Sequence, residues 1–227
     1  MKEMDNNELF TYIDHTLLKT GIVWSEVEQV GHEAAIYHAA CVVIPPCYVS
    51  RMHQMYPGVP VATVVGFPLG CSTPGAKVFE AQQAVESGAN EIEMVVNNSD
   101  IKSDRLHRVM AEITAVKNVI GDHLLKVIIE TYYLTDKEKV EVAKVVEASG
   151  AEYIKTCSGF APGGVTVADV ELLRKSVSDR VKIKAAGGIS SKQEMLDLLN
   201  AGASRLGSSN GVNILFRNQR PQPITHL

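Results

Sequence analysis

Residues 145–159, VVEASGAEYIKTCSG, hold the junction that decides the fold. The amphipathic segment 136–148 predicts a helix, and Gly150 suits the left-handed residue that commonly follows a helix end. The apolar run 153–156, just after this glycine, predicts a short strand. A chain that alternates helices and strands in this way forms parallel strands joined by right-handed crossovers.

The same junction occurs three times and predicts how the strand side chains point. The three copies are Ser87-Gly88-Ala89, Ser149-Gly150-Ala151 and Ala201-Gly202-Ala203. The fourth residue after each glycine is apolar and should face the helices: Ile92, Ile154 and Leu206. Because strand side chains alternate, the fifth residue should point inward: Glu93, Lys155 and Gly207. An inward charge is costly away from water, so these residues are expected at the wet C-terminal rim.

Eight apolar runs alternate with helical segments along the chain. The runs cover residues 13–18, 40–44, 61–67, 91–97, 124–130, 153–156, 181–185 and 204–207. The helical segments cover residues 25–39, 77–87, 103–119, 136–148, 167–175 and 192–199. Eight such units predict a single-domain (β/α)8 TIM barrel over residues 1–227, with an open doubly wound sheet as the alternative. Residues 217–227 carry two prolines and no periodicity, and are expected to form a loose tail.

Composition fits this fold and excludes several partners. The 227 residues suit one barrel, because such barrels have about 250 residues and rarely fewer than ~200. A net charge of −4 argues against nucleic acid, which requires a basic surface. The longest charge-free stretch, 52–76, is broken by four prolines and four glycines, so no membrane span is expected. The four cysteines form no Cys-x-x-Cys pair and no secretory signal is visible, which predicts a cytoplasmic protein.

Two lysines should face each other at the rim of neighbouring strands, Lys155 and Lys184. A free lysine has a pKa of about 10.4, whereas a nucleophilic amine must be neutral. A second ammonium nearby, together with desolvation, would lower the pKa. The alternative is that both lysines are paired with strand carboxylates such as Glu93 or Glu130. Glu93 is then either a general acid/base or a counter-ion, and Lys126 with Glu130 on one strand face suggests a supporting charge network.

Two turns suit a bound phosphate: Gly187-Gly188 after the seventh strand and Gly207-Ser208-Ser209 after the eighth. The loops at these positions commonly bind phosphate in TIM barrels, although each could be an ordinary turn. The seven histidines form no His-x-His or His-Glu-x-x-His pattern, and no Gly-x-Gly-x-x-Gly or Walker motif occurs. We therefore expect neither a metal nor a nucleotide cofactor.

Six ordered blocks resemble the 2-deoxyribose-5-phosphate aldolase family. They are IDHTLLK (13–19), VVGFPLG (64–70), GANEIEMV (88–95), KVIIET (126–131), IKTCSGF (154–160) and KAAGGI (184–189). The resemblance extends over residues 13–211 and implies a cofactor-free class I aldolase with a TIM-barrel fold, commonly a dimer or tetramer. Such an enzyme reversibly cleaves 2-deoxy-D-ribose 5-phosphate to acetaldehyde and D-glyceraldehyde 3-phosphate through a lysine Schiff base.

The resemblance also implies roles for individual residues. Lys155 matches the Schiff-base lysine and Lys184 the second lysine that tunes it. The other matched positions belong to the substrate site: Asp14, Thr16, Gly187, Gly188, Ser208 and Ser209. An iminium on Lys155 would act as an electron sink, so that the C–C bond breaks to an enamine rather than to a bare carbanion.

Several positions depart from the family pattern. Glu93 stands where the family has its catalytic aspartate, and Asn90 replaces a further aspartate. Cys157-Ser158 replaces Ser-Thr, Ser190 replaces an arginine, and the chain ends at Leu227 instead of a tyrosine. A shift of ~1 Å at a proton-transfer site can cost ~100-fold in rate. The alternatives are therefore an aldolase for another phosphorylated sugar, or a non-catalytic phosphosugar-binding barrel, against which the intact lysine pair argues.

Overall fold

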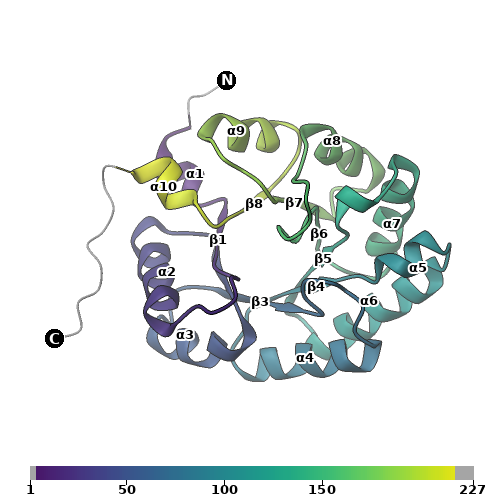
Figure 1. Ribbon diagram of the computed structural model, residues 1–227, viewed down its shortest axis with the longest axis horizontal. Helices are drawn as coiled ribbons and strands as arrows, with labels where there is room; N and C mark the ends of the chain where they lie inside the picture. The colour runs from purple at the N-terminus through teal and green to yellow at the C-terminus, as the bar shows by residue number, and fades with distance from the viewer. Residues whose placement is uncertain (1–3, 218–227) are drawn as a thin grey trace.

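Eight parallel strands close into a barrel in which each strand pairs with its neighbours in sequence and the last returns to the first (Figure 1). This computed structural model describes residues 4–217. The strands are β1 (Ile13–Thr16), β2 (Cys41–Ile44), β3 (Val61–Val65), β4 (Glu91–Val95), β5 (Leu124–Ile128), β6 (Tyr153–Lys155), β7 (Lys182–Ala186) and β8 (Arg205–Ser208). The closed barrel confirms the predicted TIM barrel and excludes the open sheet.

Helices form a ring around the barrel (Figure 1). Six of them match predicted segments: α2 (Trp24–Tyr37), α4 (Pro74–Glu86), α6 (Leu106–Ile120), α7 (Asp136–Ala148), α8 (Val167–Ser176) and α9 (Lys192–Asn200). The structure adds the helices α1 (Asn6–Phe10), α3 (Val49–Met55), α5 (Asn98–Lys102) and α10 (Gly211–Phe216), and the 3-10 turns η1 (Pro46–Tyr48) and η2 (Thr131–Tyr133). The added helices have five to seven residues, too few to show an apolar period.

The ends of the chain and of the strands differ from the expected bounds. The predicted strands 61–67, 91–97 and 124–130 each end two residues too late, because the residues after these strands continue the apolar pattern as the chain enters the loops. Of the expected tail, only Arg217 belongs to the described residues; 218–227 lie outside them. No helix in residues 4–217 is long and apolar enough to cross a bilayer.

The three Gly-Ala junctions end their helices as predicted. Gly88, Gly150 and Gly202 have φ angles of +100°, +84° and +111°, in the left-handed region. Ala89 N donates to Ala84 O at 3.0 Å, and Ala203 N to Leu198 O at 3.1 Å, so two of these junctions close with a backbone hydrogen bond. The apolar residue that follows each junction lies in the core between strands and helices, as expected: Ile92, Ile154 and Leu206.

The interior of the barrel has two unlike halves. On the side of β2 and β3 the inward side chains form a small apolar cluster: Cys41, Val43, Ala62 and Val64. On the side of β4 to β8 and β1 several inward side chains are charged, and Glu93, Lys155 and Lys184 are among them. The parallel register places Lys155 beside Lys184 on neighbouring strands. The predicted inward direction of Glu93 and Lys155 is therefore confirmed.

The helix end at Gly150 offers a test of the left-handed cap. An added Cβ would meet only Lys117 Cγ, at 4.0 Å, so Gly150→Ala changes backbone strain and little else. We expect this variant to lose about 1 kcal/mol of unfolding free energy in urea. Gly75→Ala is the matched control, because Gly75 lies in α4 with open space around it and an ordinary φ. Equal stability of the two variants would contradict the cap.

Candidate active site

A cavity of about 460 Å³ opens where the parallel strands end. Its lining consists of residues 16–19, 158–160, 186–189 and 207–209, together with Lys155. It therefore lies at the C-terminal face, the usual place for a TIM-barrel active site. The predicted site residues Thr16, Gly187, Gly188, Gly207, Ser208 and Ser209 all line it. Asp14, Glu93 and Lys184 are fully buried beneath it, whereas Lys155 is 2% exposed and reaches it.

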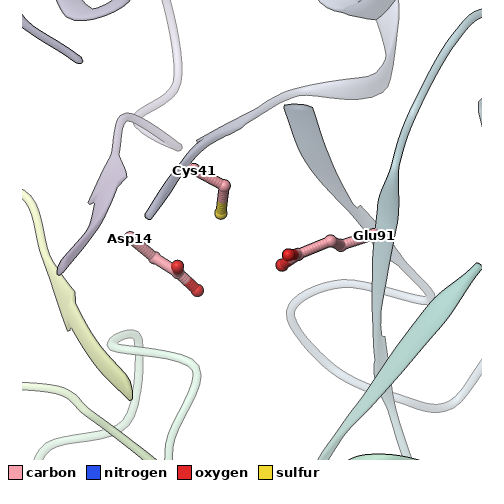
Figure 2. A group of neighbouring side chains, drawn as sticks. All are labelled: Asp14, Cys41 and Glu91. Atoms are coloured by element: carbon pink, nitrogen blue, oxygen red, sulfur yellow. The ribbon is translucent and has the colours of Figure 1, made fainter. Parts of the chain in front are cut away.

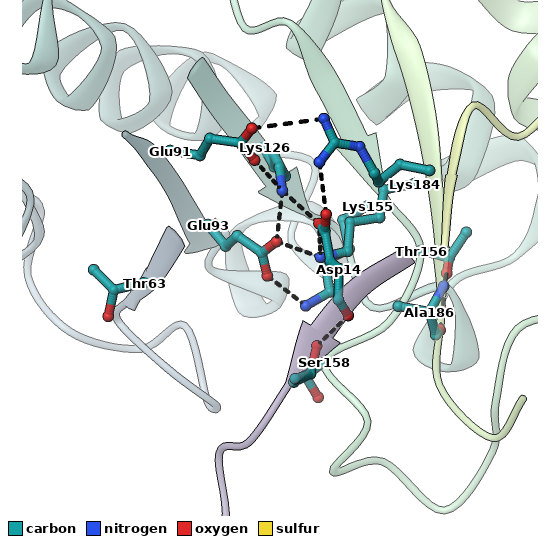
Figure 3. Close-up of polar contacts among 12 residues, drawn as sticks. Asp14, Thr63, Glu91, Glu93, Lys126, Lys155, Thr156, Ser158, Lys184 and Ala186 are labelled. Carbon is teal, nitrogen blue, oxygen red and sulfur yellow. Dashed lines mark hydrogen bonds and ion pairs between the residues drawn. The ribbon is translucent and has the colours of Figure 1, made fainter. Parts of the chain in front are cut away.

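Glu93 links three lysines under the cavity (Figure 3). Its Oε2 accepts a hydrogen bond from Lys155 Nζ at 2.7 Å. Its Oε1 accepts from Lys184 Nζ and, at 3.2 Å, from Lys126 Nζ. Burial alone would raise the pKa of Glu93, but Lys155, Lys184 and Lys126 hold it well below its usual range. Glu93 is therefore a carboxylate that contacts all three lysine amines.

Asp14 forms the second centre of the cluster, on β1. Its Oδ2 accepts from Lys126 Nζ at 2.5 Å and from Lys184 Nζ, and its Oδ1 accepts from Arg205 Nη1 at 2.7 Å. Burial opposes ionisation, yet Lys126, Lys184 and Arg205 hold the pKa of Asp14 well below its ordinary value. Lys126, Lys184 and Arg205 lie on β5, β7 and β8, far from β1 in the sequence. Their contacts with Asp14 therefore join the first strand to these three strands inside the barrel.

Lys155 differs electrostatically from Lys126. Burial lowers the pKa of Lys155, the Lys184 and Lys126 charges lower it further, and Glu93 opposes them; the net shift is downward. Burial also disfavours the charged form of Lys126, but Asp14, Glu93 and Glu91 raise its pKa well above the ordinary lysine value. The amine that touches the cavity is thus the one that loses its proton more readily.

The charge count of the cluster is consistent with a neutral Lys155. The cluster contains four bases, Lys126, Lys155, Lys184 and the partly buried Arg205, and three acids, Asp14, Glu91 and Glu93. One positive charge is in excess if every group is ionised, and an uncompensated buried charge is costly. Neutral Lys155 leaves three positive charges against three negative charges. The cluster is therefore balanced when Lys155 is deprotonated.

Two members of the cluster, Arg205 and Glu91, are absent from the sequence-based set of site residues. Arg205 Nη2 lies 3.6 Å from Glu91 Oε1, and Glu91 Oε2 lies 2.5 Å from Lys126 Nζ. Each stands two positions before an inward residue that the repeat identifies, Gly207 or Glu93. Residues two apart share a strand face, so the alternation itself carried the signal.

Glu130 does not join Lys126 as expected. It follows the end of β5 and has a φ angle of +54°, so the strand alternation no longer governs its direction. Its Oε2 accepts from the backbone N–H of Ser158 at 3.1 Å, and it holds the loop after β6 against the end of β5. Lys126 therefore belongs to a supporting charge network, as predicted. The prediction that Glu130 belongs to the same network is wrong.

Gly207 makes room for Lys184. A Cβ at Gly207 would lie 3.0 Å from Lys184 Cε and 2.8 Å from Ala186 Cβ. Gly187 and Gly188 have φ angles of +103° and +77°, so a turn of this shape favours glycine at both positions. Small residues thus serve two purposes here: Gly207 admits the lysine from below, and Gly187-Gly188 shapes the cavity wall.

Three groups in the barrel could in principle hold a metal: Asp14, Cys41 and Glu91, whose ligand atoms lie within 4.8 Å of one another (Figure 2). Lys126 Nζ lies among them, 2.5 Å from Asp14 Oδ2, 2.5 Å from Glu91 Oε2 and 3.8 Å from Cys41 Sγ. Burial and the Asp14 charge raise the pKa of the Cys41 thiol, which disfavours the thiolate that binds metals. The ammonium of Lys126 therefore takes the place of a cation in this donor set.

Removal of the Asp14 charge tests the cluster. Asp14→Asn removes the one carboxylate that Lys126, Lys184 and Arg205 all contact, and we expect a loss of about 3 kcal/mol of unfolding free energy at pH 7. The folded pKa of Asp14 lies below its unfolded value of ~3.9, so its stabilisation is complete above that pH and is lost as the pH falls through the folded pKa. Urea unfolding should show a gap between wild type and variant that narrows in acid.

The exposed Asp179 supplies the control for this experiment. Its side chain is 107% exposed and lies 3.7 Å from Arg174, so Asp179→Asn should change stability by less than ~0.5 kcal/mol. A loss in Asp14→Asn no larger than in this control would show that the barrel interior does not depend on the Asp14 charge.

Comparison with known proteins supports an aldolase. A model of the DeoC/LacD family of aldolases matches residues 9–218. A deoxyribose-phosphate aldolase from Clostridium botulinum is 46% identical over 213 residues, which cover 93% of this chain and 96% of the relative. One from Streptococcus agalactiae is 43% identical over 224 residues and covers 98% of this chain and 100% of the relative.

Solved structures agree with this assignment. A putative deoxyribose-phosphate aldolase from Coccidioides immitis superposes with a TM-score of 0.91 at 34% identity, over 95% of this chain and 87% of that chain. A deoxyribose phosphate aldolase from Aeropyrum pernix, described as a unique tetramer, gives a TM-score of 0.84 at 28% identity, over 94% and 93%. On the evidence of the barrel, the family match and these relatives, the chain belongs to the DeoC/LacD family of aldolases.

Proposed function

We propose that this aldolase reversibly cleaves 2-deoxy-D-ribose 5-phosphate to acetaldehyde and D-glyceraldehyde 3-phosphate through a Schiff base on Lys155. The observation that carries the proposal is the position of Lys155 at the cavity, with its amine hydrogen-bonded to Glu93 and its pKa lowered. The names of the relatives supply the substrate. A neutral amine in contact with bound aldehyde is what imine formation requires.

The reaction follows from these positions. The lone pair of neutral Lys155 attacks the C1 aldehyde of the open-chain sugar, and the carbinolamine takes up a proton and loses water to give an iminium. The C3 hydroxyl then loses its proton, the C2–C3 bond breaks, and its electron pair moves into the iminium to form an enamine. D-glyceraldehyde 3-phosphate departs. Protonation of the enamine at C2 and hydrolysis release acetaldehyde and restore the amine.

Neighbouring groups divide the remaining work. Lys184 keeps a positive charge beside Lys155, which favours the neutral amine. Glu93 is the counter-ion at rest and is proposed to carry protons to and from the reacting sugar, because its Oε2 is 2.7 Å from the nucleophile. Backbone N–H groups of Gly187-Gly188 and the hydroxyls of Ser208 and Ser209 are proposed to bind the phosphate. Asp14 is proposed to act on substrate through Lys184.

We further propose a cytoplasmic homo-oligomer, a dimer or a tetramer, built from one domain per chain. Cys47 and Cys71 are free thiols on the surface, which suits a reducing compartment. Leu69 and Phe79 are 76% and 63% exposed, and apolar side chains of this size suit contacts between subunits. The Aeropyrum pernix relative is described as a tetramer.

Borohydride trapping tests the nucleophile. Wild-type protein treated with acetaldehyde and borohydride should carry an ethyl group on Lys155, identified by peptide mass spectrometry, because reduction fixes the imine. Lys155→Ala should carry none in the barrel and should lose turnover. Lys182→Ala, a change at an exposed lysine on β7, is the control and should be labelled as the wild type is. Labelling of another barrel lysine with Lys155 unmodified would overturn the assignment.

Substitution of Glu93 separates a proton carrier from a counter-ion. In Glu93→Gln the amide cannot take up the proton, so turnover of 2-deoxyribose 5-phosphate should fall by ~10²–10⁴. Trapping of acetaldehyde on Lys155 should persist, because Glu93 raises the pKa of this lysine and its loss favours the neutral amine. Glu93→Asp restores a carboxylate and should recover part of the loss. Wild-type turnover in Glu93→Gln would leave Glu93 with a counter-ion role alone.

A further inference from the structure

The cavity is lined by few ionisable side chains. Its lining has two basic side chains, Lys155 and Lys19, and no acidic one among the described residues. Lys155 lies at the floor, where it is 2% exposed and hydrogen-bonded to Glu93. Lys19 is exposed on the loop between β1 and α2. A charged group bound in the upper part of the cavity therefore has one cationic side chain available to it.

Lys19 and the Ser208-Ser209 turn line the same cavity. β1 pairs with β8, and His15 lies opposite Ser208. The chain that leaves β1 stays next to β2, because Leu17 N donates to Val43 O at 2.9 Å. Residues 16–19 and 207–209 both border the cavity, so a phosphate bound at the Ser208-Ser209 turn would share this cavity with Lys19.

No cation stands directly after Gly187-Gly188-Ile189, where the family resemblance leads one to expect an arginine. Ser190 occupies this position, and its backbone N–H and hydroxyl lie 2.8 and 3.2 Å from Glu194 Oε2. The N–H of Ser190 is thus already bonded to a carboxylate, which would repel a second anion nearby. Among the described residues that line the cavity, Lys19 is the exposed cationic side chain within it.

Lys19 is free to supply this charge. None of the ion pairs among residues 4–217 involves it, whereas Lys155 and Lys184 are both held by Glu93. A lysine ammonium on a flexible stem binds phosphate as a point charge and needs no fixed geometry. Because the Lys19 side chain is exposed, its ammonium stays hydrated and pays no desolvation cost when no ligand is bound.

We propose that Lys19 pairs with the phosphate of the substrate and makes this cavity select a phosphorylated over an unphosphorylated 2-deoxy sugar. The inference rests on the proposed function and adds to it a residue that sets substrate preference. Lys19 is a binding residue that lies away from the C2–C3 bond. Its loss should therefore act on KM for the phosphorylated sugar far more than on kcat.

The experiment compares two substrates and three variants. Lys19→Ala is assayed for cleavage of 2-deoxyribose 5-phosphate and of 2-deoxyribose, and the ratio of the two kcat/KM values is determined. A hydrogen bond to a charged group corresponds to a change of roughly tenfold or more, so the ratio should fall at least tenfold. Lys19→Arg keeps the charge and should restore most of it. Lys137→Ala removes a lysine that is 84% exposed on α7 and should keep the wild-type ratio.

A titration with inorganic phosphate gives a readout that does not depend on turnover. Its dissociation constant should rise at least tenfold in Lys19→Ala and stay at the wild-type value in Lys137→Ala. Equal losses on both sugars, or an unchanged ratio and unchanged phosphate binding, would overturn the role of Lys19. Absence of acetaldehyde trapping in the wild type would instead refute the Schiff-base function, and the phosphate titration would still decide on Lys19.

Discussion

The charged interior of this barrel depends on ion pairs that take the place of water around the buried groups. Asp14 and Glu93 are fully buried, and moving such groups out of water costs several kcal/mol each even after relaxation. The cost is offset because each carboxylate accepts hydrogen bonds from lysines on different strands. The same contacts that permit the burial also orient the basic side chains that make them. Preorganisation of the site and integrity of the barrel are thus one property of the molecule.

The fold could be predicted from the sequence because its signals are local and repeated. Gly150 and its two counterparts each mark a helix end, and alternation after them orients Glu93, Lys155 and Gly207 correctly. Short helices such as α1 and α10 gave no signal, since five or six residues cannot show a period. The turn at Gly187-Gly188 could be predicted because paired glycines between a strand and a helix indicate positive φ angles, which both residues adopt.

Which acid pairs with which base could not be predicted, because closure of the barrel decides which strands become neighbours. Asp14 and Arg205 are 191 positions apart, and only the return of β8 to β1 brings them within 2.7 Å. The prediction for Glu130 was wrong for the opposite reason, a local one. Glu130 itself has a positive φ angle, so its side chain does not lie on the strand face that the alternation predicts. Pairing across a closed sheet and a local change of backbone conformation are both invisible to periodicity.

The position of Lys126 makes the charge balance of the barrel interior independent of metal ions in solution. Its ammonium lies where two carboxylates and one thiol converge, a set of groups that can bind a divalent ion in other proteins. A positive charge that is covalently part of the chain cannot be removed by a chelator, diluted away or exchanged for a competing metal. The carboxylates at the bottom of this barrel are thereby neutralised at every ion concentration, and the site above them is built as soon as the chain has folded.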